Sequence, residues 1–446
     1  MREGRIHMDG IRIFFLLILW GLMILFSPQA QEITLYGDAE TRMDVLFPGG
    51  SGDDRYDSLL NPGNLFGLND ILFTADVTGK LEGASDRGGF ALWLSLEKYP
   101  VASGLYAAAY GDVNQSWAVA EFTAGQGSSI LALDLMRLYY EWYTTDALRM
   151  TFGRQSFLTG YGYGWNPMDL ANPLKDPSDP DQDLTGVDAL SLTLDRGGLL
   201  QMKAYVLFHD DESDGLAAED VKGGAEITLQ LPWTEIKLNG LAGASADEAE
   251  RFPNSAGLGF LTDVMGIGIY GEGAFRESRR APVPGDAPDY QLVRKDGWVF
   301  SGLAGLEYYF PSELAVTLEY FYNGEGLDQA ERADYAEALA FFNGTLGAAP
   351  AGYYELYRPG YFSRHYLLLN LFYPFYGLSS ELNVSVIGSP DSASLSILPE
   401  WTILPTGNLE ISLSWAGSFS LDDDRYNEAW LYPVNHSLAL EAVYHF

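Results

Sequence analysis

The sequence predicts an all-β fold, a transmembrane, antiparallel, up-and-down β-barrel of about 18 strands. Three observations lead to this prediction. Apolar and polar residues alternate over long segments, the links between these segments are alternately long and short, and an apolar run near the N-terminus is typical of an export signal. A strand that crosses a bilayer needs about nine to eleven residues, whereas strands in general average about five or six.

The N-terminal element is predicted to be an export signal. Basic residues precede the apolar run 13–26, which is short for a membrane helix and suits the central part of a signal peptide. We expect residues 1–30 to be a signal peptide that is cleaved after Ala30, and residues 31–446 to form the barrel. An uncleaved anchor helix is the alternative. No Cys follows the run, which excludes a lipoprotein.

The strands are predicted from a period of two. In residues 33–47, apolar side chains such as Leu35 and Phe47 occupy one parity, and polar ones such as Glu40 and Arg42 occupy the other. We assign the segment 117–124 to a loop. The expected strands are 33–47, 71–83, 89–98, 130–143, 147–157, 187–194, 199–209, 224–231, 235–245, 255–262, 265–276, 297–310, 313–323, 361–373, 378–388, 393–403, 407–419 and 435–446.

The links between these strands predict a closed barrel. Tight turns alternate with long loops, and only the link 389–392 is short where a long one is expected. Tight turns at one end and large loops at the other are typical of outer-membrane barrels, and an even strand count places both termini on the periplasmic side. In lipid, a closed sheet also satisfies every backbone hydrogen-bonding group. The chain has no fixed internal period, which argues against a propeller or solenoid.

The last strand ends on an aromatic residue. Apolar residues occupy every second position from Leu438 to Phe446, with Tyr444 among them. This pattern resembles the C-terminal signal that the barrel-insertion machinery recognises, so we expect Tyr444 and Phe446 to act as an assembly signal. An ordinary C-terminal strand is the alternative.

Charge and composition exclude several functions. A formal net charge of −35 repels the phosphates of nucleic acid, which excludes a nucleic-acid partner. The chain has no Cys, and the four His beyond the signal stand in no nucleophile motif, so we do not expect an enzyme.

The polar parity of each strand is expected to face the lumen, where acidic residues outnumber basic ones. Such a wall favours cations or neutral solutes mildly. Alternatively, these groups pair across strands and brace the wall. The predicted pore-lining residues are Arg42, Asp76, Lys80, Arg137, Glu141, Arg149, Lys203, Glu226, Glu272, Glu307, Glu319 and Arg364.

One long loop alternates glycine with aromatic residues, Tyr161, Tyr163 and Trp165. Aromatic rings between glycines suit stacking on a flat ligand or sugar ring, and they suit equally an interfacial girdle or a packed loop core.

The same loop contains clustered carboxylates, which suit Ca²⁺, the one cofactor that the sequence suggests. Their spacing departs from the EF-hand pattern, and a solvated acidic loop is the alternative. The candidate metal ligands are Asp176, Asp179, Asp181 and Asp183.

The longest loop, 324–360, is predicted to contain a short amphipathic helix, with residues such as Leu327, Tyr335 and Phe342 on its apolar face. The helix would narrow the pore, cap its mouth or lie on the surface.

Residues 149–155, RMTFGRQ, and the later stretch NPMDLANP resemble the strand-and-loop signature of porin-like outer-membrane proteins related to the alginate-export barrels. The stretch 319–326, EYFYNGEG, is similar to a later strand end in such proteins. The resemblance implies a barrel of about 18 strands that moves solutes passively, and it singles out Gly153, Arg154 and Gln155. An acidic lumen departs from the basic one that a polyanion exporter needs, which puts alginate itself in doubt.

The function expected on these grounds is an outer-membrane, porin-like channel for small hydrophilic solutes. It would contact outer-membrane lipid and lipopolysaccharide. The alternative is a non-conducting structural or adhesive barrel with binding loops.

Overall fold

The computed structural model describes residues 32–48, 56–65, 68–100, 117–124, 129–157, 159–172, 174–208, 221–243, 253–282, 290–422, 426–431 and 433–446. The predicted signal peptide lies outside the described residues. Among the described residues, no helix combines the length and the apolar composition needed to span a membrane.

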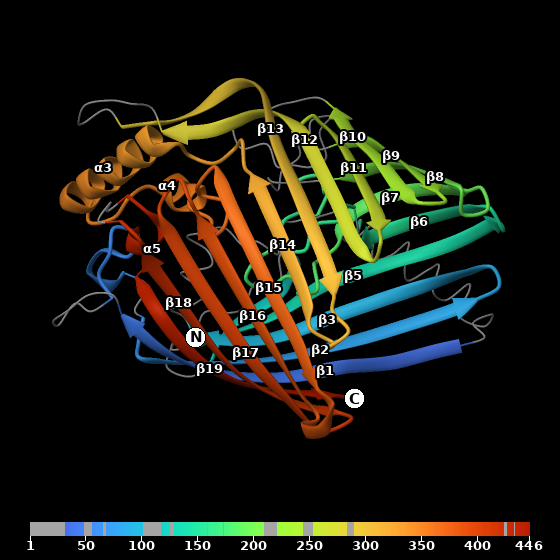
Figure 1. The fold of residues 1–446 in the computed structure, drawn as a ribbon, viewed down its shortest axis with the longest axis horizontal. Helices are drawn as coiled ribbons and strands as arrows, with labels where there is room; N and C mark the ends of the chain where they lie inside the picture. Colours follow the sequence, from blue (N-terminus) through green and yellow to red (C-terminus); the bar gives the residue numbers. More distant parts are fainter. Residues whose placement is uncertain are drawn as a thin grey trace.

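Eighteen antiparallel strands form a closed ring, in which β19 pairs with β1 (Figure 1). This confirms the predicted fold class. The ring strands are β1 (Glu32–Pro48), β2 (Ile71–Ser85), β3 (Gly88–Pro100), β5 (Ser129–Thr145), β6 (Leu148–Gln155), β7 (Val187–Asp195), β8 (Leu200–Phe208), β9 (Val221–Leu231), β10 (Thr234–Gly243), β11 (Ser255–Val264), β12 (Ile267–Pro282), β13 (Leu292–Tyr309), β14 (Ala315–Tyr322), β15 (His365–Phe375), β16 (Ser380–Ser389), β17 (Ser394–Thr406), β18 (Leu409–Ser420) and β19 (Val434–His445).

A further strand, β4 (Trp117–Ala124), corrects the prediction of a loop at 117–124. β3 pairs with residues 129–142 of β5 on one edge. On the other edge, β6 pairs with residues 138–145 of β5, and β4 pairs with residues 129–135. β5 has 17 residues and β6 only eight, so β4 satisfies backbone groups of β5 that β6 does not reach. The ring still contains eighteen strands.

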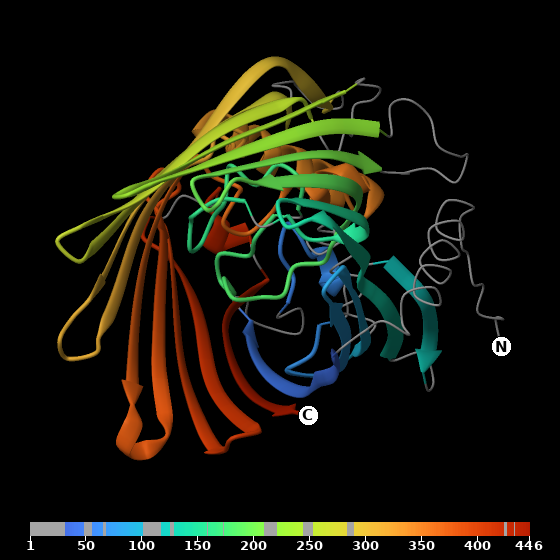
Figure 2. The ribbon, with the colours of Figure 1, turned by 90° about the vertical axis from the view of Figure 1, so that its right-hand side faces the viewer.

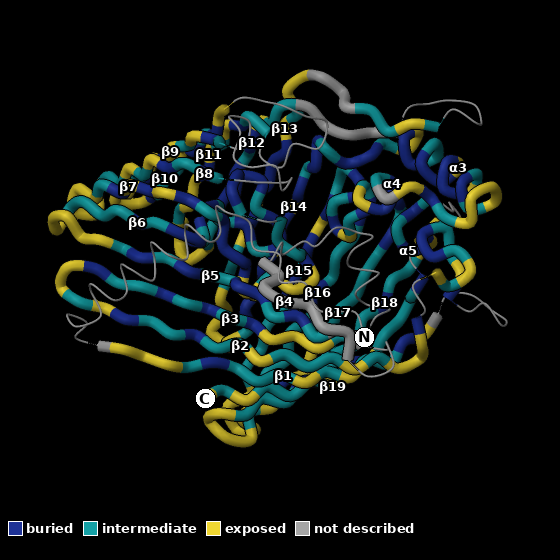
Figure 3. Tube along the Cα trace, turned by 180° about the vertical axis from the view of Figure 1, so that it is seen from behind, coloured by how far each residue is buried: buried dark blue, intermediate teal, exposed yellow. Residues whose placement is uncertain are grey.

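The two faces of the wall differ as the alternation predicts. Large apolar side chains such as Leu35, Phe73 and Leu258 point outward and are at least half exposed. Charged side chains on the opposite parity, such as Glu226 and Glu319, are buried inside, and Figure 3 shows the resulting alternation along the strands. An apolar exterior around a polar interior is the arrangement that a barrel needs in lipid.

The strands differ in length around the ring. β6 to β11 contain eight to eleven residues each. β1, β2, β3 and β5 contain 13 to 17 residues. We call the end with the tight links the turn end and the other the loop end. The link 390–393 between β16 and β17 is at the loop end and is short, as the sequence indicates.

The helices lie together at the loop end (Figure 1). They are α3 (Gln329–Leu346), α4 (Ala351–Leu356) and α5 (Glu428–Leu431), and the short helices η2 (Pro62–Asn64) and η3 (Tyr376–Leu378) belong to two of the links. α3 begins at a capping box of Asp328 and Glu331 and ends at Gly347, whose φ of 83° suits glycine. It confirms the helix predicted within 324–360.

Three segments of the loop end share one apolar core, and we call them together the roof: residues 56–65, residues 327–362 and α5. Buried residues of this core include Leu60, Tyr335 and Leu431. α3 is largely buried on one side, as Figure 3 shows. The helix therefore caps the barrel and does not lie free on the surface.

Candidate functional site

The segment between β6 and β7 folds into the barrel. Figure 2 shows this segment, residues 156–186, inside the ring of strands, and we call it the inner loop. Residues 158 and 173 of it are not described. Its side chains and backbone bond to luminal groups of β2, β5, β9, β10, β12 and β14. The sequence predicted a loop here but not its place in the lumen.

Glu319 on β14 holds the inner loop most firmly. It is fully buried, and its two carboxylate oxygens accept hydrogen bonds from the backbone N–H groups of Tyr163 and of Gly164, the latter at 2.9 Å. The Tyr270 hydroxyl donates a third bond at 2.7 Å. Hydrogen bonds to a charged acceptor are stronger than neutral ones, so this carboxylate binds loop backbone rather than facing open water.

Two further wall carboxylates bind the same stretch. Glu272 Oε2 accepts the Tyr161 N–H at 2.7 Å, and Glu226 Oε2 accepts the Thr159 hydroxyl at 2.8 Å. The Tyr161 hydroxyl donates to Glu235 Oε1 at 2.9 Å. Three predicted pore-lining acids, Glu226, Glu272 and Glu319, thus meet at the inner loop.

The alternating glycines of the inner loop allow this close approach. Gly160 has a φ of 109°, and a Cβ there would lie 2.9 Å from Glu272 Oε2. A Cβ at Gly162 would lie 1.8 Å from the Trp165 carbonyl oxygen. The glycine repeat therefore serves backbone contact with the wall and a tight turn.

Trp165 belongs to a packed core. Its exposed fraction is 0%, and its ring lies 5.2 Å from that of Phe321 and 5.7 Å from that of Tyr366. Its indole N–H donates to the Gly360 carbonyl at 2.9 Å. A solute cannot stack on this ring, which corrects the ligand-binding assignment of Trp165. Tyr161 and Tyr163 remain partly exposed.

The C-terminal part of the inner loop is held on the far side of the lumen. Lys80 on β2 pairs with Asp183 at 2.7 Å and with Asp38 at 3.5 Å. Arg137 on β5 donates to the Leu184 carbonyl at 3.1 Å. Both cations lie over the Trp93 ring, Arg137 at 3.8 Å and Lys80 at 4.5 Å from its centre. The inner loop therefore crosses the lumen from β14 to β2.

The luminal side of β17, β18, β19 and β1 keeps water-accessible polar groups, and we call it the open arc. Arg42 is 40% exposed and pairs with Asp44 at 3.1 Å and Glu441 at 3.3 Å. Glu410 is 38% exposed and Asp38 31%. The polar side chains of the open arc are thus less buried than those that hold the inner loop.

Acidic groups of the inner loop and of the open arc influence one another. Desolvation, followed by the charges of Asp176, Asp181, Glu400 and Glu441, raises the pKa of Asp179 on the inner loop to about 6. Glu400 and Glu441 belong to β17 and β19, so the loop carboxylate lies within electrostatic range of the open arc. Negative charge is therefore carried both by the inner loop and by the open arc.

The predicted calcium site is not supported. Among the described residues, no group of three or more His, Asp or Glu side chains is arranged to hold a metal ion. Asp183 is paired with Lys80, and Asp176 accepts the Ser178 N–H at 2.8 Å. These two carboxylates therefore stabilise the inner loop itself.

The other predicted pore-lining acids and bases mostly brace the wall. Asp76 accepts hydrogen bonds from Ser95 and Thr78. Glu141 pairs with Arg149 at 3.6 Å. These contacts fit the alternative that single charges pair across strands.

Lys203 lies over the ring of Phe157 at 5.3 Å. Glu307 on β13 lies opposite Gly268 of β12, and among the residues that the structure describes it has no hydrogen bond to the inner loop. Arg364 needs a correction, because it precedes β15 and pairs with Asp328 and Glu331 at the start of α3. It belongs to the base of the roof rather than to the pore wall.

The residues singled out by resemblance lie within the wall. Arg154 is buried and pairs with Asp188 of β7 at 3.4 Å. Gln155 donates to the Ala189 carbonyl at 3.1 Å and accepts from Ser191 at 2.8 Å. Gly153 adopts a φ of 117°. These contacts join β6 to β7 next to the start of the inner loop.

The C-terminus completes the ring. The N–H of Phe446 donates to the Gly37 carbonyl at 2.9 Å, and the N–H of Gly37 donates back at 3.1 Å. Tyr444 and Phe446 are each about half exposed, at 51%. Their role as an assembly signal stays a prediction.

Solved structures with this fold include bacterial porins. Pseudomonas aeruginosa OccK8 (OprE) matches with a TM-score of 0.52 at 9% identity, over 94% of this chain and 98% of that chain. Salmonella typhi OmpF, in complex with daunomycin, gives a TM-score of 0.45 at 11% identity, over 94% and 99%. A triple mutant of the Rhodopseudomonas blastica porin gives 0.43 at 10% identity, over 93% and 100%.

The match to OccK8, at 9% identity, establishes similarity of fold alone. No family model matches the sequence, and no curated protein matches it. The predicted link to alginate-export barrels is therefore not supported by these comparisons and stays a prediction.

Proposed function

We propose that the chain is an outer-membrane channel through which small hydrophilic solutes pass passively. The observation that carries this proposal is the open arc, where polar side chains beside the inner loop remain accessible to water. The arc lies inside a closed ring of strands whose outer surface is apolar. The barrel would be inserted with its loop end facing the cell exterior and its turn end facing the periplasm, as is typical of outer-membrane barrels.

We also propose a mild preference for cations and neutral solutes. Asp179 on the inner loop lies within range of the charges of Asp181, of Glu400 on β17 and of Glu441 on β19, and Arg42 is already neutralised by Asp44 and Glu441. Fixed negative charge around a narrow passage raises the local concentration of cations.

Planar-bilayer recording of the purified protein tests both statements. We expect stepwise conductance, and a reversal potential in a KCl gradient that shows K⁺ passing more easily than Cl⁻. Equal or anion-leaning permeability would refute the charge argument. Absence of any conductance would refute the channel and favour a non-conducting structural or adhesive barrel. Liposome swelling with sugars, amino acids and organic acids would then identify the solute class.

Delivery to the outer membrane completes the proposal. We infer a signal peptide cleaved after Ala30, recognition of the strand that ends in Tyr444 and Phe446 by the barrel-insertion machinery, and contact of the exterior with lipid and lipopolysaccharide. N-terminal sequencing of the protein recovered from outer membranes should begin at Gln31. A retained N-terminal segment would contradict the cleavage.

A further inference from the structure

The roof crosses the mouth of the barrel. At the C-terminal end of α3, the Asn343 side chain donates to the Leu59 carbonyl at 2.9 Å, in the link between β1 and β2. The ring of Phe341 lies 5.5 Å from that of Tyr290, just before β13. β13 and β1 are separated by β14 to β19 in the ring, so the roof joins two distant parts of the rim.

The roof also lies over the open arc. Its core includes Leu46 of β1, and Val434 of β19 packs against it. α5 contacts β17 and β18. These four strands are the ones whose luminal side is the open arc. The inner loop is held on β2, β5, β9, β10, β12 and β14, so the inner loop and the roof obstruct complementary parts of the lumen.

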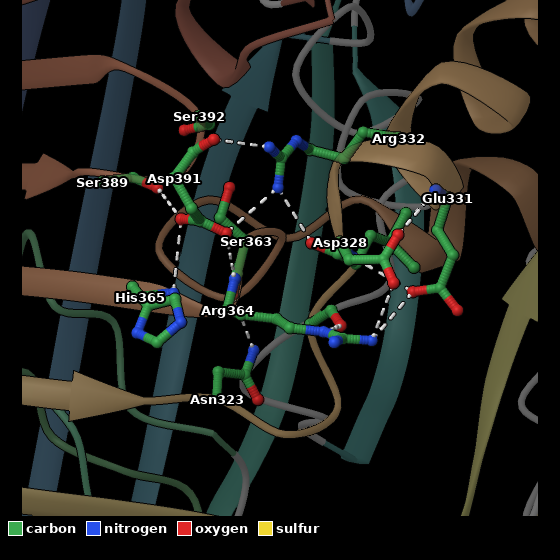
Figure 4. Close-up of polar contacts among 12 residues, drawn as sticks. Asn323, Asp328, Glu331, Arg332, Ser363, Arg364, His365, Ser389, Asp391 and Ser392 are labelled. Atoms are coloured by element: carbon green, nitrogen blue, oxygen red, sulfur yellow. Dashed lines mark hydrogen bonds and ion pairs between the residues drawn. The ribbon is translucent and has the colours of Figure 1, made fainter.

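Asp391 fixes the base of the roof. It lies in the short link between β16 and β17, and its carboxylate accepts a bond from Arg332 Nη1 at 3.1 Å. The Asp391 carbonyl accepts Arg332 Nη2 at 2.7 Å. The backbone N–H of Arg364 donates to the carboxylate at 3.2 Å, and Ser389 Oγ donates at 3.0 Å, as Figure 4 shows.

The partner of Asp391 has no contact with water. Arg332 on α3 is 0% exposed, and its Nη1 also donates to the Leu327 carbonyl at 2.9 Å. Arg364 adds ion pairs to Asp328 at 3.2 Å and Glu331 at 3.3 Å (Figure 4). Separating Arg332 from Asp391 would leave a buried cation without its counter-ion, which is unfavourable. The start of α3 is therefore held at the link between β16 and β17.

We propose that the roof limits the size of solute that enters the open arc, and that Asp391 is the positioning residue that holds the roof over it. The proposal rests on the proposed channel function but concerns access to the lumen, which can be measured without conductance. It also explains why the link 390–393 is short where a long loop is expected, because a longer link would not present one fixed carboxylate to α3.

Labelling of a single cysteine tests the proposal, because the chain has no Cys of its own. Asp181→Cys places a thiol at an exposed position of the inner loop. Intact cells are treated from outside with a small methanethiosulfonate or with a maleimide that carries a bulky polyethylene glycol chain. The labelling rates are compared with and without Asp391→Ala.

We expect Asp391→Ala to raise the rate of bulky labelling at least tenfold and to leave the rate of small-reagent labelling within about twofold. Arg332→Gln should act in the same way. Asp422→Asn, the same loss of one negative charge at an exposed site on the loop end, should change neither rate. Heat-modifiable migration on gels establishes that each variant forms a barrel.

Unchanged bulky labelling in both Asp391→Ala and Arg332→Gln would overturn the proposal, as would rapid bulky labelling with the roof intact. Bilayer recording of the same variants separates the two proposals. If no variant conducts but bulky labelling rises, the channel function fails and the placement of the roof stands. If the unmodified chain conducts and the variants show the same size limit, the role of Asp391 fails alone.

Discussion

Glu319→Ala should release the inner loop from β14. The substitution leaves three buried donors without an acceptor, the N–H groups of Tyr163 and Gly164 and the Tyr270 hydroxyl. Each orphaned buried donor costs about 1–3 kcal/mol, so the docked state of the loop loses at least about 3 kcal/mol. A loss of that size lowers the ratio of docked to undocked loop roughly a hundredfold.

Single-channel recording measures the consequence. We expect Glu319→Ala to show a larger mean conductance and more open-channel noise, because an undocked loop leaves the lumen wider and moves within it. Trypsin should also cleave after Lys175 faster in the variant, since this lysine lies in the docked loop with its Nζ near the Gly162 carbonyl.

Glu307→Ala is the matched control, because it removes a luminal glutamate of the neighbouring strand that binds no donor of the inner loop in the described contacts. It should change conductance only slightly. If a correctly assembled Glu319→Ala protein has the conductance, noise and trypsin sensitivity of the wild type, Glu319 does not hold the inner loop against β14.

Three further predictions concern charge and closure. Lys80→Gln removes the ion pair to Asp183. Because that carboxylate is half exposed, the substitution should lower the free energy of unfolding by less than about 1 kcal/mol. The loss of a luminal positive charge should raise the permeability ratio of K⁺ to Cl⁻ in reversal-potential measurements. Acidification from about pH 7.5 to pH 5 should lower the K⁺ preference, because desolvation raises the pKa of Asp179 to about 6, and Asp179→Asn should weaken this pH dependence. Since that pKa lies above the usual range of an aspartate, protonation favours the folded loop: its stability rises as the pH falls through 6 and declines again as the pH rises. Removal of Phe446 deletes two backbone hydrogen bonds to Gly37, so the yield of heat-modifiable barrel should fall; an undiminished yield would count against a role in assembly.

The ring itself could be predicted because lipid imposes a simple rule on each strand. Every second side chain must be apolar, so a segment such as 33–47 identifies itself without knowledge of its neighbours. All eighteen predicted strands occur in the ring, with shifts of a few residues at their ends. β4 was missed because its pairing depends on where β6 ends, and a local pattern does not contain that information.

The lumen was harder to predict, because its contacts join residues far apart in the chain. Glu319 and Gly164 are 155 positions apart, and no local spacing indicates that one binds the other. Glu235, Tyr270 and Arg332 were not singled out from the sequence. Glu235 binds the inner loop at Tyr161, Tyr270 donates to Glu319, and Arg332 of the roof donates to Asp391. Two signals were usable: the apolar pattern within 324–360, which predicted α3, and the unusually short link at 389–392, which contains Asp391, the partner of Arg332.

The unequal height of the wall has a consequence for the surrounding bilayer. A strand of eight or nine residues, as in β6 to β8, extends about 26–30 Å along its axis and only about 19–21 Å along the membrane normal at a tilt of 45°. The apolar band of outer-membrane barrels is about 25 Å tall. Lipid next to this sector must therefore thin, or the whole molecule must lean so that its short flank stays covered. In oriented bilayers, we expect the barrel axis to be tilted by a fixed angle from the membrane normal, with the bilayer thinnest next to β6 to β8.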